Sequence, residues 1–316
     1  MSKDRPRNVA ASVRQRLLTR SREQGEEFQL VLTRYALERL LYRLSQSPHR
    51  DVFVLKGAML FRLWTDQPHR PTKDLDLLGY GELSIERFEG IFRDVCGQAV
   101  DDDGLRFEPD SVRGERIRED QEYEGLRIHC IALLERARVT IQVDIGFGDA
   151  ITPAAVAVVF PTLLDFPAPT LRAYPRETVV AEKYQAMVSL GIANSRMKDF
   201  YDIWVLARQF AFAGTTLGSA IRATFVRRKT ALPTKPPLAW TPTFYDDATK
   251  KQQWQAFLKK SKLDVGGAAL EQVCLFLKNF LMPPTQALHA GEDFFPTWPP
   301  AGPWSANQEG EGGANG

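Results

Sequence analysis

The chain has 316 residues, a net charge of +2 at pH 7 and an apolar fraction of 44%, which are ordinary values for a soluble globular protein. At roughly 150 residues per domain, this length predicts about two domains. The near-neutral charge excludes a polycation, so any contact with nucleic acid must rest on local patches.

The three cysteines, Cys96, Cys130 and Cys274, are far apart in the sequence and fit no metal-ligand spacing. This odd, sparse count favours reduced thiols over a disulfide framework. The N-terminal residues lack the apolar core of a signal peptide, and no stretch approaches the roughly eighteen apolar residues needed to cross a bilayer. We therefore expect a cytoplasmic protein with no membrane segment.

The first half of the chain predicts helices followed by a mixed sheet. Residues 8–22 and 25–46 are expected to be helices, because apolar residues recur at three- and four-residue steps. A short apolar strand then runs into Lys56 and a helical turn, and residues 72–79 predict a second strand. Residues 84–98 predict an amphipathic helix capped by Ser84. Beyond residue 104, alternating residues predict three or four largely antiparallel strands, of which RVTIQVDIGFG is the clearest.

From residue 176 onward the pattern is helical. One helix ends near Gly191 and the next begins near Met197, with Phe200, Ile203 and Trp204 in its buried stripe. We therefore predict an α+β chain, in which a mixed-sheet lobe with flanking helices precedes a mainly helical lobe. The expected parts are an N-terminal helical arm at 1–24, an α/β domain at 25–175, a helical domain at 176–282, and a tail rich in Pro and Gly at 283–316 that is either disordered or laid loosely on the surface.

Asp74 and Asp76 place two carboxylates in an otherwise apolar run. Residues two apart on a strand point to the same side, and two such anions repel each other unless a cation or a proton is shared. Asp144 lies on another predicted strand. If the two strands are neighbours, the three carboxylates form the ligand set of a two-metal phosphoryl-transfer site for Mg²⁺ or Mn²⁺. Chance is the alternative, since 39 acidic residues would give roughly five such pairs.

Two further features carry charge near possible phosphate sites. In the turn LKGAML, small residues that open a helix leave backbone N–H groups for an anion, and Lys56 adds charge; an ordinary tight turn is the alternative. Farther on, Lys198, Asp199 and Asp202 lie opposite the apolar stripe of their helix, and Lys183 lies on the helix before it. These residues would either clamp a triphosphate or form an exposed ion pair worth under about 1 kcal/mol.

Two segments are locally basic, RATFVRRK at 222–229 and KQQWQAFLKKSK at 251–262. Positive charge of this kind suits an RNA backbone. Solvated faces of ordinary helices are an equally good interpretation.

Four sequence blocks occur in one order: LKGAMLFRLW, RPTKDLDLL, IQVDIGFGD and AEKYQAMVSLGIANSRMKDFYDIWVL. As a set they resemble the AbiEii/AbiGii-type nucleotidyltransferase toxins of the polymerase-β-like nucleotidyltransferase superfamily. The resemblance runs from about residue 25 to 210, with an extension to about residue 280. It implies a nucleotidyltransferase-like mixed sheet in a catalytic domain, with the helical domain completing the active site.

The resemblance also implies roles for single residues. Gly57 matches the first-motif glycine, and Ala58 stands where the superfamily usually has Ser or Gly, which removes a possible hydroxyl contact. Asp74 and Asp76 match the metal-binding pair, and Arg70 lies shortly upstream as in the family pattern.

The remaining matches lie later in the chain. Asp144 matches the third acidic position, as a metal ligand or a base. Lys183 matches a lysine that contacts the triphosphate, and Lys198, Asp199 and Asp202 match the last motif. The implied catalytic set is Asp74, Asp76, Asp144, Lys183 and Asp199, and the implied nucleotide-binding set is Lys56, Gly57, Ala58, Arg70, Lys183, Lys198 and Asp202.

The activity implied is that of a metal-dependent toxin of a toxin–antitoxin or phage-defence system. It would transfer a nucleoside monophosphate from an NTP to an RNA acceptor, the 3′ end of tRNA, and block translation; a cognate antitoxin protein is the expected partner. Two alternatives stay open. The same fold would modify a protein side chain or transfer a phosphate, or an inactive fold would bind nucleotide or RNA.

Overall fold

The computed structural model describes residues 8–65, 70–120 and 123–306. The chain divides into two compact units. The first comprises Met1–Asp149 and Val156–Tyr174, and the second comprises Ala150–Ala155 and Pro175–Gly316. The units are interleaved in sequence, because a short segment before the last two strands of the first unit belongs to the second.

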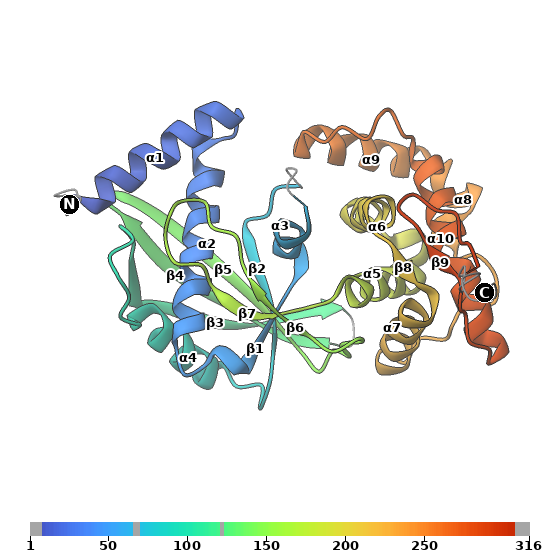
Figure 1. The fold of residues 1–316 in the computed structure, drawn as a ribbon, viewed down its shortest axis with the longest axis horizontal. Coiled ribbons are helices and arrows are strands. Elements are labelled where there is room, and N and C mark those ends of the chain that lie inside the picture. The colour runs from blue at the N-terminus through green and yellow to red at the C-terminus, as the bar shows by residue number, and fades with distance from the viewer. Residues whose placement is uncertain (1–7, 66–69, 121–122, 307–316) are drawn as a thin grey trace, which may run out of the picture. The chain divides into compact units, whose positions relative to one another are not determined.

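The described part of the first unit is built on a seven-stranded mixed sheet (Figure 1). Its strands are β1 (Phe53–Lys56), β2 (Asp74–Gly79), β3 (Arg106–Asp120), β4 (Tyr123–Leu134), β5 (Ala137–Phe147), β6 (Val156–Val159) and β7 (Thr170–Ala173). Their order across the sheet is β3-β4-β5-β2-β1-β7-β6. Strand β2 is antiparallel to β1 and parallel to β5. The predicted α+β class with a mixed sheet is confirmed.

Helices form where the apolar periodicity predicts them. The helical segments of this unit are α1 (Val9–Gln24), α2 (Phe28–Gln46), η1 (Arg50–Val52), η2 (Gly57–Leu60), α3 (Phe61–Trp64) and α4 (Ile85–Gly97), where η marks a 3₁₀ turn. Ser84 caps α4 as predicted, because its hydroxyl accepts a 3.3 Å hydrogen bond from the backbone N–H of Arg87. Helices α1, α2 and α4 pack against the sheet.

The two faces of the sheet differ in chemistry. Leu55, Leu77 and Ile145 share one cross-strand row, and all three are buried. Phe88 of α4 packs on this face, with its ring centroid 5.2 Å from that of Phe147. Successive residues of a strand point to opposite faces. The row displaced by one residue therefore lies on the other face, and that row is charged.

A buried ion cluster fixes α2 to the loop before β3. Arg39 Nε and Arg43 Nη1 donate to Asp103 Oδ2 at 2.8 and 2.7 Å, and the Asp103 side chain has no exposed surface. Burial disfavours the ionised carboxylate, but the hydrogen bonds and charges of Arg43 and Arg39 outweigh it and lower the pKa of Asp103. Both guanidiniums therefore depend on one buried negative charge.

Replacing Asp103 by Asn would leave those two buried guanidiniums facing a neutral amide. We expect Asp103→Asn to lower the free energy of unfolding by about 3–5 kcal/mol, measured by urea denaturation. The control is Asp101→Asn, an exposed carboxylate two residues away, for which we expect a change within about 0.5 kcal/mol. Equal effects of the two substitutions would contradict a charge-dependent anchor.

The described part of the second unit is mainly helical, as predicted. Its elements are α5 (Arg176–Leu190), η3 (Gly191–Ala193), α6 (Met197–Gln209), β8 (Phe212–Ala213), α7 (Gly214–Arg227), η4 (Leu238–Trp240), α8 (Pro242–Tyr245), α9 (Ala248–Ser261), α10 (Leu270–Ala290) and β9 (Thr297–Trp298). Helix α5 packs against α6 and α7, and α10 packs against the same two helices (Figure 1). No described helix is long and apolar enough to cross a membrane.

The predicted disorder of the C-terminal tail is wrong up to residue 306. Pro283 and Pro284 lie inside α10. Farther along, Trp298 is 2% exposed, and its indole N–H donates to the Ala207 carbonyl at 2.7 Å. Composition is misleading here because the few apolar residues are large aromatics, each of which buries a large area. The remainder of the predicted tail, at 307–316, lies outside the described residues, as do residues 1–7 of the predicted N-terminal arm.

Candidate active site

Charged side chains form a row across the polar face of the sheet. Lys56 on β1 is the register partner of Asp76 on β2, Asp76 is the partner of Asp144 on β5, and Asp144 is the partner of Arg127 on β4. Residues directly opposite each other on neighbouring strands have side chains on the same face. The row therefore reads cation, anion, anion, cation.

Asp74 lies one row farther along the same face, because it is two residues from Asp76 on β2. Its register partner is Gln142 of β5. The strands thus gather Asp74, Asp76 and Asp144 on one face, and all three are partly buried. Arg70 lies in the irregular segment that leads into β2. The roles of these residues in binding metal or nucleotide stay predictions.

Asp144 is held by a two-point ion pair that the sequence analysis missed. Arg127 Nε donates to Asp144 Oδ1 at 2.8 Å, and Arg127 Nη2 donates to Oδ2 at 2.9 Å. Gln142 Nε2 lies 3.2 Å from both oxygens of the same carboxylate. This bidentate geometry is the strong form of the interaction, and the hydrogen bonds to Asp144 raise the pKa of Arg127. Only the register of β4 with β5 could have identified Arg127.

The turn after β1 brings the backbone against Asp76. Gly57 has a φ of +75°, a conformation that favours glycine. A Cβ at this position would lie 2.6 Å from both Cβ and Cγ of Asp76. Ala58, which follows, is buried in the 3₁₀ turn η2. The glycine is therefore required by its backbone conformation and by the close approach of Asp76, while the predicted phosphate cradle stays a prediction.

Lys56 is held by the carboxylate of Asp149, a residue that the sequence analysis missed. Its Nζ lies 2.9 Å from Asp149 Oδ2, and the two side chains are only 9% and 7% exposed. The Tyr174 hydroxyl donates to the same oxygen at 3.2 Å. Asp149 is the last letter of the block IQVDIGFGD, but no local signal links it to a lysine on β1. The position of the Lys56 ammonium is thus fixed by Asp149 and Tyr174.

Two of the three carboxylates suit a hard divalent cation. Asp74 and Asp76 supply oxygen ligands of the kind that Mg²⁺ prefers, and the lack of a side chain at Gly57 allows the Asp76 carboxylate to lie against the turn. Arg127 engages both oxygens of Asp144, and the role of Asp144 as a third ligand or as a base stays a prediction. Among the described residues, no group of three or more His, Cys, Asp or Glu side chains is placed to hold a metal ion.

The helical unit contains a buried ion cluster of its own. Lys183 Nζ on α5 lies 2.6 Å from Asp199 Oδ1 and 2.9 Å from Asp202 Oδ2 on α6, and both carboxylates are 0% exposed. Arg196 Nε lies 2.6 Å from Asp199 Oδ2. Burial disfavours ionised Asp199, but the charges of Lys183 and Arg196 outweigh it and lower its pKa. The estimate for an exposed ion pair therefore does not apply here.

The last predicted motif divides between the two faces of α6. Asp199 and Asp202 are buried, whereas Lys198 is exposed. The periodicity of the sequence predicts that all three lie on one polar, solvated face of the helix. It does not reveal that Lys183 balances the charges of Asp199 and Asp202, which allows both carboxylates to be buried. The predicted contacts of Lys183, Lys198 and Asp202 with nucleotide stay predictions.

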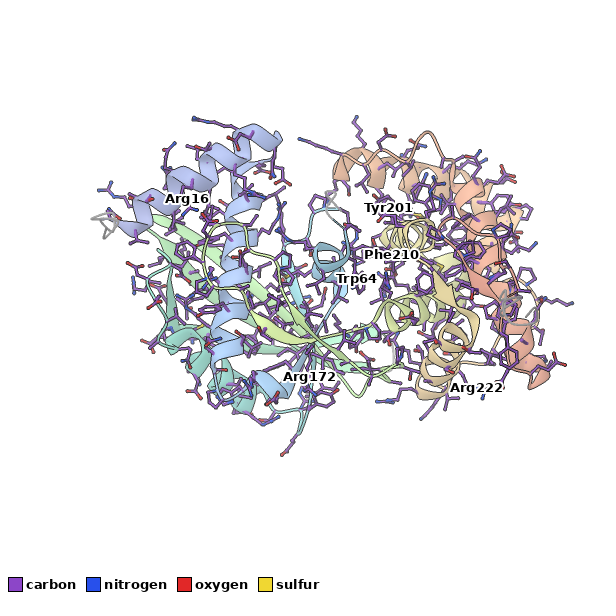
Figure 2. All side chains as sticks on the ribbon, viewed as in Figure 1. Arg16, Trp64, Arg172, Tyr201, Phe210 and Arg222 are labelled. Carbon is purple, nitrogen blue, oxygen red and sulfur yellow. The ribbon has the colours of Figure 1, made fainter. Side chains whose placement is uncertain are left out.

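The two basic segments are only partly exposed. Arg222 on α7 is exposed (Figure 2), whereas Arg228 is turned inward and donates to Gln185 Oε1 at 3.0 Å. Lys259 and Lys260 are exposed in the last turn of α9. Exposed cations are available for RNA in both segments, and solvated helix faces remain the alternative.

The family model described as nucleotidyl transferase AbiEii toxin, type IV TA system, matches residues 39–273. This chain belongs to the AbiEii nucleotidyltransferase toxin family. The match contains the four ordered blocks, so the resemblance seen in the sequence is confirmed. Membership of the family assigns the chain to the nucleotidyltransferases of a type IV toxin–antitoxin system, which implies an antitoxin partner.

Two solved structures from Helicobacter pylori are similar to this chain. The first, described as JHP933, has 15% identity and a TM-score of 0.48, with 84% of this chain and 95% of that chain covered. The second, described as "putative nucleotidyltransferase from H. pylori", has 15% identity and a TM-score of 0.47, with 85% and 100% covered. A comparison with curated proteins finds no match.

Substituting Gly57 tests the close approach to Asp76. We expect Gly57→Ala to lower the free energy of unfolding by about 1–3 kcal/mol or more, because the new Cβ meets Asp76 and the backbone is left-handed. Gly90→Ala in α4 is the control, since a Cβ there meets nothing within 4 Å, and we expect it to raise stability by about 0.5–1 kcal/mol. If urea denaturation showed that both substitutions change the free energy of unfolding in the same direction, the close approach of Gly57 to Asp76 would be refuted.

The buried cluster of the helical unit predicts a stability that depends on pH. We expect Lys183→Met to lower the free energy of unfolding by about 3–5 kcal/mol near pH 7. The folded-state pKa of Asp199 is lowered, so its contribution is present above the unfolded value near 3.9 and is lost as the pH falls through the folded value. The difference between wild type and variant should therefore shrink below about pH 4.

The matched control for this substitution is Lys251→Met, which removes an exposed lysine paired with Asp246. Its effect should stay within about 0.5 kcal/mol at any pH. A loss for Lys183→Met that does not change between neutral and acidic pH would show that charge pairing is not its cause.

Proposed function

We propose that this chain transfers a nucleoside monophosphate from an NTP to the 3′ end of a tRNA, releasing pyrophosphate and blocking translation. The family supplies the reaction class, and the carboxylate-bearing face of the sheet supports the finer statement. Asp74, Asp76 and Asp144 lie on neighbouring strands beside Lys56 and the Gly57 turn. That combination suits a triphosphate with a divalent cation.

Asp74 and Asp76 would hold Mg²⁺ or Mn²⁺. Two carboxylates on one face repel each other, which favours a cation between them. When bound, the ion would neutralise charge on the triphosphate and on the departing pyrophosphate. Gly57 allows Asp76 to lie against the turn, so the carboxylate is held by backbone packing rather than by a mobile loop.

The other charged residues of the face would orient the reactants. Lys56, positioned by Asp149, would attract the triphosphate through its fixed ammonium group. The acceptor hydroxyl oxygen would form a bond to the α-phosphorus as the bond to the pyrophosphate oxygen breaks. Asp144, which Arg127 holds in one orientation, would receive the hydroxyl proton.

The acceptor is proposed from chemistry as well as from family. A tRNA is a polyanion that exposed cations attract. Arg222 on α7 and Lys259 and Lys260 on α9 are exposed and suit such a backbone. They provide attraction without sequence specificity.

The direct test is incubation with tRNA and Mg²⁺ and each of the four common NTPs in turn. At least one NTP should lengthen the tRNA 3′ end by a nucleoside monophosphate, which its mass identifies, and EDTA should abolish the reaction. We expect Asp76→Asn to reduce the rate by about 10²–10³-fold or more. Its thermal midpoint, measured alongside, separates a loss of activity from a loss of the fold.

Asp110→Asn is the control for this test, because it removes an exposed carboxylate on β3 of the same sheet. It should leave the transfer rate unchanged. Absence of product with every NTP, or normal activity of Asp76→Asn, would contradict the proposed function.

A further inference from the structure

The charged row that contains Asp144 continues to the edge of the sheet. Asp144 is the register partner of Arg127 on β4, and Arg127 is the partner of Glu115 on β3. The exposed fraction of the side chain rises along this row, from 15% for Asp144 to 31% for Arg127 and 59% for Glu115. The polar face therefore opens toward solvent on the side of Asp144 that is away from β2.

The neighbouring rows of the same face are also open. Gln142 on β5 is the partner of His129 on β4, and His129 is the partner of Arg113 on β3. Thr140 and Arg138 share the face of Gln142, because they alternate with it along β5. Arg113, Thr140 and Arg138 are exposed. We call the set of Arg113, His129, Arg138, Thr140 and Gln142 the outer face.

Helix α4 covers the opposite face of the same strands. A Cβ at Gly114 of β3 would lie 2.9 Å from Cγ2 of Ile85 on α4 and 3.2 Å from Cδ1 of Ile128 on β4. Ile128 and Val143 on that side are 0% exposed. An antiparallel sheet commonly leaves one face in water, so exposure alone does not indicate a binding surface. The charges of the outer face and its position beside Asp144 are the further observations.

Two guanidinium groups give the outer face its charge. Arg113 Nη1 donates to the carbonyls of Asp110 and Val112 at 2.8 and 2.7 Å, so neutral groups hold it in place. Arg138 is exposed and forms no ion pair with any residue that the structure describes. Guanidinium N–H groups match phosphate oxygens in geometry and in charge. Both arginines therefore suit the backbone of a nucleic acid.

The acids that border the outer face have basic neighbours. Glu115 Oε1 lies 3.5 Å from His129 Nε2, and Glu108 Oε1 lies 3.4 Å from Arg106 Nη2. Arg106 is exposed, as are Arg113 and Arg138. These three arginines outnumber the two acids, so the outer face with its border has an excess of positive charge. A polyanion is the ligand that complements it.

The order of groups across the sheet indicates where the acceptor would lie. In the proposed reaction, Lys56 on β1 attracts the triphosphate, and Asp74 and Asp76 on β2 hold the cation. The attacking and leaving oxygens lie roughly in line, on opposite sides of the phosphorus. If the pyrophosphate leaves over β1 and β2, the acceptor hydroxyl approaches from the side of Asp144. The outer face continues from Asp144 on that side.

We propose that the outer face binds the backbone of a single-stranded RNA acceptor whose 3′ end lies at Asp144. The identity of this ligand rests on the proposed function. From the spacing of residues and strands, the Cα atoms of Arg113 and Arg138 lie about 12 and about 20 Å from that of Asp144. At about 3.4 Å per stacked nucleotide, these distances correspond to about four and about six nucleotides. Such contacts position the strand without reading its sequence.

The test measures binding of a ten-nucleotide single-stranded RNA in the absence of NTP, so that no transfer occurs. We expect the double variant Arg113→Met/Arg138→Met to bind about tenfold or more weakly than wild type. The slope of log affinity against log salt should fall in magnitude by about 1.4, because each phosphate contact with a single strand contributes about 0.7. Unchanged affinity and slope, or no RNA binding by wild type, overturns the proposal.

The single variant Arg138→Met guards against damage to the fold. Its side chain is exposed and has no hydrogen bond to any described residue, so its removal should leave the thermal midpoint unchanged. The salt slope should still fall in magnitude by about 0.7. A folded Arg138→Met with the salt slope of wild type overturns the proposal.

The matched control is Arg22→Met/Arg50→Met, which removes two exposed arginines of the same unit, from α1 and from the turn η1. It should leave the RNA affinity within about twofold of wild type. Equal losses in the two double variants would reduce the effect to net charge and overturn the proposal.

Two more measurements identify the cause of the loss. Arg113→Lys/Arg138→Lys keeps both charges, so its salt slope should match that of wild type although the planar fork is lost. The Met double variant should bind ATP with Mg²⁺ within about twofold of wild type, because the triphosphate lies over β1 and β2. A slope of the Lys variant as low as that of the Met variant, or an equal loss for ATP, overturns the proposal.

The transfer assay with tRNA gives an independent result. If wild type transfers no nucleotide yet binds RNA through the outer face, the proposed reaction is wrong and the binding surface stands. If wild type transfers a nucleotide to RNA but the Met double variant binds that RNA equally well, the reaction stands and the outer face is not its acceptor site. A protein as the modified product, with no RNA bound, contradicts both.

Discussion

The register of β2 between β1 and β5 is the constraint on which the site depends. The register pairs Lys56 with Asp76 and Asp76 with Asp144, so these three residues fall in a single row. A shift of one residue would turn the charged row onto the apolar face and expose the leucines. Burial of Leu55 and Leu77 therefore sets where the charges lie. The core of the sheet thus positions the candidate active site.

The row also explains how the chain can fold with two acids on neighbouring strands. Like charges placed opposite each other destabilise a sheet. Here Arg127 engages both oxygens of Asp144, and Asp149 engages the Lys56 ammonium. Arg127 thus offsets the repulsion at Asp144 without an external ligand. The helical unit contains a comparable arrangement, in which Lys183 forms ion pairs with the fully buried carboxylates of both Asp199 and Asp202.

Local sequence patterns predicted much of the fold and the gathering of the three acids. Apolar periodicity identified α1, α2 and α4, and alternation identified β5 and the shared face of Asp74 and Asp76. The partners Arg127 and Asp149 could not be predicted, because strand register and loop paths alone bring them beside Asp144 and Lys56. Composition also failed for the C-terminal segment, where aromatic side chains replace the aliphatic residues of an ordinary core.

The central claim is that this face of the sheet binds a divalent cation between the carboxylates of β2. Crystals of the chain soaked with Mn²⁺ and a non-hydrolysable NTP test it directly, since Mn²⁺ scatters anomalously. The account predicts an anomalous peak within coordination distance of both Asp74 and Asp76, about 2.0–2.3 Å, with triphosphate oxygens on the same ion. A nucleotide bound with its Mn²⁺ away from these two residues would contradict the account.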